Sequence, residues 1–187
     1  MKLPKKTFEC NLFKSGYRYV IGVDEVGVGC LAGPVVVCAI VFNEKFFNQK
    51  HKKLHWLRES KLLTAHQREY FAQELLKEKN LVYALAYSYP NTIDKLNIYQ
   101  AARLAMKRAV KKLTRMTLVA YKSHPCIVLV DGKNKIKGLN IDQVAIVKGD
   151  RKVFAIACAS IIAKVYRDKM MARYSKKYPG YGFEKHK

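Results

Sequence analysis

Acidic residues follow three segments that are predicted to form strands. The segments are residues 19–23, 127–130 and 143–147, all of them mainly apolar. The acids that follow them are Asp24, Glu25, Asp131 and Asp150. Binding sites of α/β proteins form where the carboxyl ends of neighbouring strands meet at one edge of the sheet. We therefore expect these four side chains to converge.

Convergent carboxylates predict a metal site. Several ionised carboxyl groups within a few ångströms of one another repel unless a cation neutralises them. Ligands that are all oxygen suit hard ions, so we expect Mg²⁺ or Mn²⁺. Two such ions about 4 Å apart can activate a water molecule and stabilise the leaving oxygen when a phosphodiester is hydrolysed. Taken singly, each acid could instead be a turn former or a helix cap.

The charge of the chain indicates the substrate. The 187 residues include 36 Lys and Arg against 14 Asp and Glu, a net charge of +22 that favours nucleic acid as the partner.

A membrane span needs about 20 continuous apolar residues. The longest apolar stretch, residues 30–42, is shorter and contains Gly33-Pro34. The amino terminus lacks the pattern of a secretory signal, so we expect a cytoplasmic protein, acting as a monomer.

Strands and helices alternate along the chain. Predicted strands cover residues 19–23, 35–42, 82–89, 127–130 and 143–147, and the first two could pair as a hairpin. Predicted helices cover residues 64–79, capped by Thr64, then 93–113 and 152–177, where Pro179 and Gly180 follow. This order predicts a single α/β domain over residues 1–187, in which helices flank a central sheet.

Seven short motifs stand out along the chain. They are IGVDEVGVGCLAGPVV at residues 21–36, ESKLL at 59–63, NIYQA at 97–101, VDG at 130–132, KGD at 148–150, IACASIIAKVYRD at 156–168 and YPGYGF at 178–183. In sequence and in order, these motifs resemble those of the ribonuclease HII family. The resemblance implies a ribonuclease H-like fold with a mixed central sheet. It also implies that Asp24, Glu25, Asp131 and Asp150 are the catalytic, metal-binding acids.

The same resemblance implies a substrate. It predicts cleavage of RNA paired with DNA, and of ribonucleotides embedded in duplex DNA, leaving 3′-hydroxyl and 5′-phosphate ends. The loop Gly27-Val28-Gly29 would contact the 2′-hydroxyl groups that distinguish RNA from DNA. Ser60 and Lys61 would contact phosphate.

The chain departs from the family pattern at three places. Val28 stands where an arginine or lysine is usual, so we expect a weaker grip on the substrate. Glu59 replaces an aspartate, which we expect to have a small effect. The family usually continues after His186-Lys187 with Gly-Tyr-Gly-Thr. We therefore expect that a carboxy-terminal segment is missing and that recognition of single ribonucleotides is impaired.

Two other classes of function stay open from the residues. A non-catalytic protein that binds RNA/DNA hybrids, an inactive relative, would account for the net charge but not for acids after three strands. A dinucleotide-dependent oxidoreductase would account for glycines after a strand. The spacing of Gly27, Gly29 and Gly33 is wrong for it, however, and Asp24-Glu25 would place negative charge beside the pyrophosphate.

Overall fold

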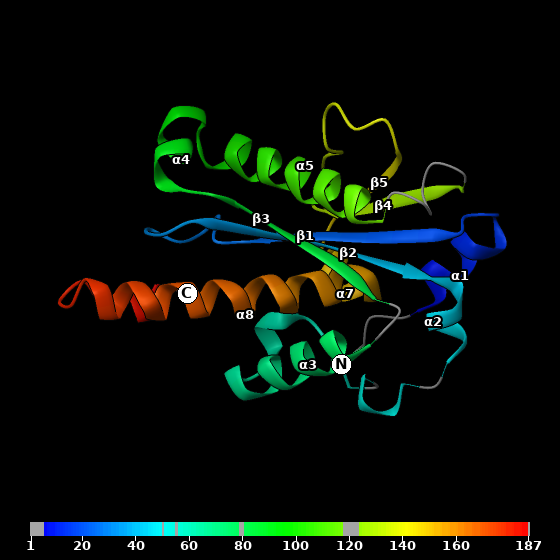
Figure 1. Cartoon of the computed structure of the whole chain (residues 1–187), viewed down its shortest axis with the longest axis horizontal. Coiled ribbons are helices and arrows are strands. Elements are labelled where there is room, and N and C mark those ends of the chain that lie inside the picture. Colours follow the sequence, from blue (N-terminus) through cyan, green and yellow to red (C-terminus); the bar gives the residue numbers. More distant parts are fainter. Residues whose placement is uncertain (1–5, 50, 55, 79–80, 118–123, 187) are drawn as a thin grey trace.

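The computed structural model describes residues 6–49, 51–54, 56–78, 81–117 and 124–186. A sheet of five strands, in the order β3-β2-β1-β4-β5, forms the centre. The strands are β1 (Tyr19–Val26), β2 (Val35–Asn43), β3 (Val82–Ser88), β4 (Cys126–Asp131) and β5 (Asp142–Ile146). β2 is antiparallel to both β1 and β3, whereas β1, β4 and β5 are parallel. The predicted mixed sheet and the hairpin of the first two strands are thus confirmed (Figure 1).

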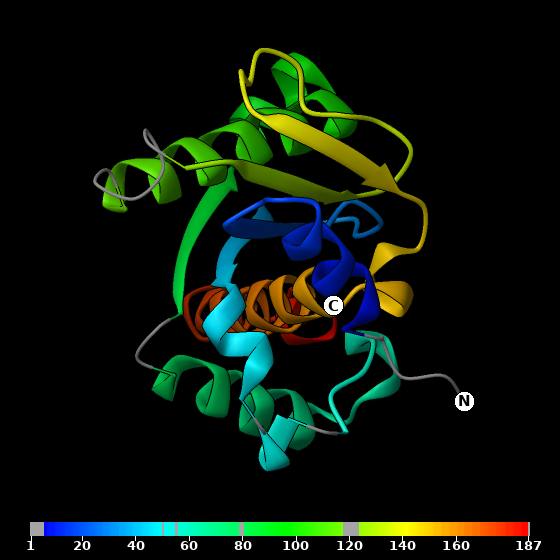
Figure 2. The ribbon, with the colours of Figure 1, turned by 90° about the vertical axis from the view of Figure 1, so that its right-hand side faces the viewer.

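Helices cover both faces of this sheet. α5 packs on one face, α8 packs on the other, and α3 lies against α8 (Figures 1 and 2). The helices are α1 (Thr7–Lys14), α2 (Glu44–Asn48), α3 (Ala65–Lys77), α4 (Pro90–Leu96), α5 (Ile98–Met116), α7 (Gly149–Lys152) and α8 (Phe154–Lys177). Short 3-10 turns are η1 (Lys52–Leu54), η2 (Ser60–Leu62) and η3 (Phe183–Lys185).

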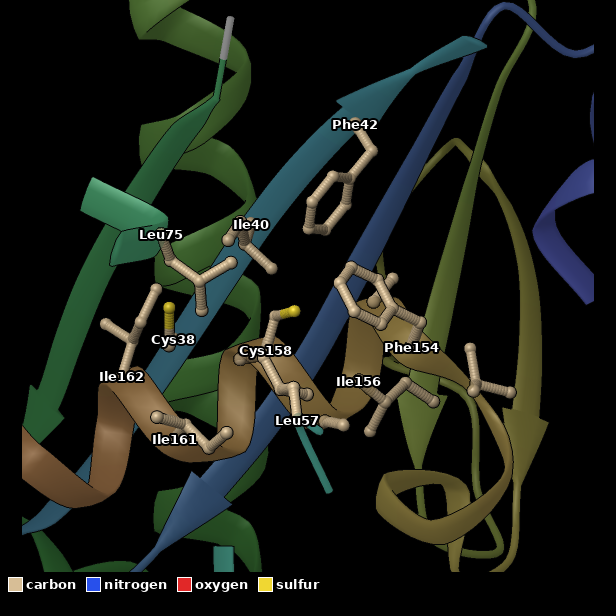
Figure 3. Packing of buried hydrophobic residues seen from close by; sticks show 14 of the residues in the cluster. Cys38, Ile40, Phe42, Leu57, Leu75, Phe154, Ile156, Cys158, Ile161 and Ile162 are labelled. Carbon is tan, nitrogen blue, oxygen red and sulfur yellow. The ribbon is translucent and has the colours of Figure 1, made fainter. Parts of the chain in front are cut away.

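The central strands are apolar on both sides because both sides are covered. Every residue of β2 except Asn43 is buried. Cys38, Ile40 and Phe42 point toward the apolar side chains of α8 (Figure 3), and the residues between them pack on the α5 side. A strand buried on both faces is expected to be continuously apolar rather than alternating. This explains the valine-rich run of residues 35–42.

The start of α8 lies directly against β1. A Cβ atom at Gly22 of β1 would lie 2.3 Å from the carbonyl carbon and oxygen of Ala155 in α8. A real side chain cannot come this close to the backbone, so only glycine permits the contact. Gly22 therefore sets the distance between the sheet and the helix.

The character of α8 changes along its length. All residues from 154 to 163 are buried, whereas the second half of the helix carries exposed charged residues. A helix segment that is apolar all round belongs in a core. Among the described residues, no helix is both long and apolar enough to cross a membrane.

The predicted helix boundaries need correction. The helix predicted for residues 93–113 is two helices, because Asn97 adopts φ +66° between α4 and α5. The Asn97 side chain accepts a hydrogen bond from the N–H of Gln100 and so caps α5. Pro90 begins α4, at a position where the missing N–H of proline costs nothing. The last predicted helix begins at Phe154, after the separate turn α7.

Three further differences concern the segments before residue 80. β1 runs to Val26, so Asp24 and Glu25 lie inside the strand and not after it. α1 and α2 were not predicted, since short helices depend on tertiary contacts more than on local pattern. Thr64 caps α3 as predicted, with Gln67 completing a capping box, and α3 ends at Lys77. Residue 79, the predicted end of α3, lies outside the described residues.

We predict that Gly22→Ala lowers the free energy of unfolding by at least about 2 kcal/mol, because the added methyl group forces α8 away from β1. Urea denaturation measures the change. Gly29→Ala is the matched control, since nothing lies within 4 Å of a Cβ atom there. Equal stability of the two variants would contradict the account of the β1–α8 contact.

A buried carboxyl group holds α1 against the start of α8. Glu9 is fully buried, and its Oε1 accepts a hydrogen bond of 2.7 Å from the N–H of Ala155. Its Oε2 is buried and has no hydrogen-bond partner among the described residues. Burial raises the pKa of Glu9 to about 7 from its usual 4.5, although the bond from Ala155 lowers it. Folding therefore favours the protonated form of Glu9.

This shift predicts how stability depends on pH. A pKa raised by folding contributes stability that is complete below pH 4.5 and is lost as the pH rises through about 7. The loss is at most roughly 3.5 kcal/mol, since the pKa rises by about 2.5 and one pKa unit corresponds to about 1.4 kcal/mol. Urea denaturation between pH 5 and 8 should therefore show a larger decline for the wild type than for Glu9→Gln. Parallel curves for the two proteins would show that Glu9 is not the cause.

Candidate metal centre

The structure brings the four predicted acids into one pocket at the edge of the sheet. Asp24 and Glu25 lie in β1, and Asp131 is the last residue of the neighbouring parallel strand β4. The paired positions of these strands end one residue before Asp24 and Asp131. Asp150 lines the same pocket, which has a volume of about 430 Å³. The acids therefore share one site, while their catalytic role stays a prediction.

A tight turn places Asp150 beside β4. Lys148 adopts a left-handed conformation with φ +55°, and α7 begins at the next residue. The N–H of Gly149 donates a hydrogen bond of 2.6 Å to Oδ1 of Asp131. A Cβ atom at Gly149 would lie 3.2 Å from Oδ1 of Asp131 and 2.6 Å from Cδ1 of Ile156. Glycine at this position thus lets the backbone approach and orient the Asp131 carboxylate.

Burial and mutual repulsion make the negative charges of the acids costly. Burial raises the pKa of Asp24 well above its ordinary value, and the charges of Glu25 and Asp131 raise it further. Burial, then the charge of Asp131, raises the pKa of Glu25 to about 7. Oε2 of Glu25 is buried without a hydrogen-bond partner among the described residues. Burial also raises the pKa of Asp150. A cation in the pocket would relieve all of these effects.

The chemistry of the pocket fits a hard divalent ion that keeps open positions. Among the described residues, no three or more His, Cys, Asp or Glu side chains are positioned so that they could together hold a metal ion, so the fit rests on the chemistry of the donors. One oxygen of Asp24 accepts the N–H of Glu25, and the Ser160 side chain also hydrogen-bonds to this carboxyl group. One oxygen of Asp131 accepts the N–H of Gly149. Mg²⁺ commonly binds through one or two carboxylates and takes water and phosphate as its other ligands. The donor set therefore fits such an ion.

Basic and hydroxyl side chains form the opposite wall of the pocket. Ser60 and Lys61, for which the resemblance implies contact with phosphate, line it from the turn η2. The Ser60 hydroxyl is hydrogen-bonded at 2.9 Å to that of Ser160 in α8. Lys164, one helical turn after Ser160, also lines the pocket and pairs with Asp168 at 2.8 Å. We did not predict Lys164, although a spacing of four residues from Ser160 places both on one face of a helix.

Glu59 does not enter the pocket. Its carboxylate is almost fully buried and forms an ion pair with Arg151, with Oε2 at 2.7 Å from Nε. Arg151 directly follows Asp150 in α7. The ion pair therefore ties the turn that carries Lys61 to the turn that carries Asp150.

A buried arginine holds the glycine loop between β1 and β2. Gly27, Val28 and Gly29, for which the resemblance implies contact with the 2′-hydroxyl groups, line the pocket. Arg167 of α8 is fully buried and donates hydrogen bonds to the carbonyls of Pro34 at 3.0 Å, and of Ala32 and His186 at 2.9 Å. Gly27 has φ +116°, and a Cβ atom there would lie 2.7 Å from Nε of the arginine. No local sequence signal marked Arg167, because its partners lie far away along the chain.

Comparison with solved structures gives the class of the protein. Ribonuclease H2 from Pyrococcus horikoshii OT3 superposes with a TM-score of 0.70 at 28% identity, over 88% of this chain and 79% of that one. Bst-RNase HIII, solved in complex with Mn²⁺, gives a TM-score of 0.70 at 20% identity, over 87% of this chain and 56% of that one. The chain thus has the fold of the type 2 ribonucleases H.

Sequence comparison then gives the family. The family model for ribonuclease HII matches residues 21–187. Ribonuclease HII from Caldicellulosiruptor saccharolyticus is 45% identical over 179 residues, which cover 96% of this chain and 80% of the relative. The chain belongs to the ribonuclease HII family and is an RNA-strand endonuclease.

We predict that Asp24→Asn stabilises the chain in the presence of chelator, because it removes one of several repelling charges. The free energy of unfolding at pH 8 should rise by about 1 kcal/mol or more, the equivalent of one pKa unit. Addition of Mg²⁺ should then stabilise the wild type more than the variant. Asp94→Asn, on the exposed surface of α4, is the matched control. A variant less stable than the wild type in chelator would show that the acids do not repel one another.

Proposed function

We propose that this chain hydrolyses the RNA strand of RNA/DNA hybrids, and DNA at embedded ribonucleotides, with two divalent ions. The products would carry 3′-hydroxyl and 5′-phosphate ends. One observation carries the proposal: four acids out of 14 gather in one pocket of a chain whose net charge is +22. We further propose that the chain acts in the cytoplasm as a monomer, with nucleic acid as its partner.

The acids Asp24, Glu25, Asp131 and Asp150 would hold the ions, which we propose to be Mg²⁺ or Mn²⁺. Bound ions would activate the attacking water and stabilise the leaving oxygen. The burial of Asp24 and the unpartnered oxygen of Glu25 support this assignment. The Mn²⁺ complex of Bst-RNase HIII, which shares the fold, is consistent with it.

The other wall of the pocket would position the substrate. Lys61 and Lys164 would attract the phosphate groups on either side of the cleaved bond, and the Ser60 hydroxyl would donate to one of them. The backbone of the loop Gly27-Val28-Gly29 would contact the 2′-hydroxyl, the group that DNA lacks. Arg167 would keep that loop in place by holding the carbonyls of Ala32 and Pro34.

We predict that Asp131→Asn reduces cleavage of a hybrid by about a thousandfold or more, as expected for one member of a group that acts as a unit. The asparagine keeps the oxygen that accepts the N–H of Gly149, so the fold should persist. Asp142→Asn is the matched control, because Asp142 lies at the start of β5, where it accepts a hydrogen bond from Tyr17.

The assay uses an all-RNA/DNA hybrid and a DNA duplex with one ribonucleotide, each with Mg²⁺, Mn²⁺ or chelator. We expect metal-dependent products that Asp131→Asn does not give and Asp142→Asn does. Cleavage in chelator, or equal cleavage by both variants, would refute the metal-centre assignment. Binding without cleavage by the wild type would indicate a non-catalytic hybrid-binding protein instead.

A further inference from the structure

A second groove adjoins the metal centre on the α5 side of the sheet. It has a volume of about 480 Å³, and Glu25 and Asp131 line both this groove and the metal pocket. The remaining charged residues that line it are Arg103 from α5, and Lys133 and Lys137 from the loop between β4 and β5. We call this the α5 groove. Its inner end is therefore acidic and its outer wall is basic.

The loop between β4 and β5 is anchored, although most of it is exposed. Ile136 is 2% exposed and packs in the core on the α5 side. Its N–H donates to Oε1 of Gln143 at 2.9 Å, and its carbonyl accepts from Nε2 of the same side chain at 3.1 Å. The Arg103 guanidinium donates to the carbonyl of Lys135, which ties the loop to α5. The lysines that flank this anchored segment are consequently held beside the groove.

The positive charges of the α5 groove are available to an anion. Lys133 and Lys137 are exposed, and neither forms an ion pair with a described carboxylate. The Arg103 guanidinium donates to the backbone carbonyl of Lys135. A carbonyl carries no net charge, so this contact does not neutralise the positive charge of Arg103. Tyr99, 70% exposed, stands on the same wall. Basic side chains beside an exposed aromatic ring are typical of surfaces that follow a nucleic-acid backbone.

We infer that the α5 groove binds a backbone phosphate of the duplex, on the opposite side of the metal centre from Lys61 and Lys164. The inference rests on the proposed function, since it takes the hybrid as the substrate. A duplex whose scissile phosphate lies at the acids extends to both sides of the cut. Lys61 and Lys164 lie on one side, and Lys133 and Lys137 supply the matching charges on the other.

The first experiment measures hybrid binding in chelator, where no cleavage occurs, as a function of salt concentration. The double variant Lys133→Gln/Lys137→Gln should bind about tenfold more weakly at low salt, and the slope of log Kd against log salt should fall by about 1 to 2. Lys111→Gln/Lys112→Gln is the matched control, because these exposed lysines lie at the far end of α5 and remove the same charge. Equal slopes for the two double variants would overturn the inference.

A second experiment locates the contact. Single neutral methylphosphonate linkages are placed in turn along each strand of the hybrid. One position should weaken binding by the wild type and have no further effect on the Lys133/Lys137 variant, and the strand in which it lies identifies the bound backbone. Absence of any such position would overturn the inference.

The two proposals fail separately. If the wild type binds the hybrid but does not cleave it with metal, the proposed function is wrong and the binding comparison still tests the α5 groove. If the wild type cleaves and both double variants bind alike, only the groove is wrong.

Discussion

The contact between Gly22 and the backbone of Ala155 fixes where α8 lies on the sheet, and most of the site depends on that helix. With α8 seated on β1, Lys164 reaches the pocket and Arg167 reaches the glycine loop. The turn α7, just before α8, carries Asp150 to the end of β4. A looser contact would shift all three side chains together, because they lie on α8 and on the turn α7 that leads directly into it. The site therefore requires glycine at residue 22, because any side chain there would move α8.

The acids concentrate negative charge where the rest of the chain is basic. Burial raises the pKa values of Asp24, Glu25 and Asp150, and the charge of Asp131 raises all three further. Such a cluster opposes folding, and proteins retain costly groups of this kind at functional sites. The surrounding lysines attract a polyanion, while the acids exclude a phosphate from the floor of the pocket unless cations are present. The lysines can thus attract the duplex without metal, whereas the approach of the scissile phosphate to the acids depends on metal.

The strand ends predicted the convergence of the acids because the geometry of a parallel sheet is regular. Two kinds of feature could not be predicted from the sequence. Arg167 acts through carbonyls more than 130 residues earlier in the chain, and no local pattern reports such contacts. The break at Asn97 depends on a left-handed residue in an otherwise helical pattern, and the apolar periodicity continues across it. The roles of Gly27, Val28 and Gly29 came only from the family resemblance, since glycines after a strand suit several kinds of site.

The most direct test of the metal centre is anomalous X-ray scattering from crystals of the chain grown with Mn²⁺ and a hybrid that carries an uncleavable linkage at the cut site. The account predicts two anomalous peaks in contact with oxygens of Asp24, Glu25, Asp131 and Asp150 and with the phosphate between the strands and α7. Peaks bound elsewhere, or no peak in the pocket while the hybrid is present, would contradict it.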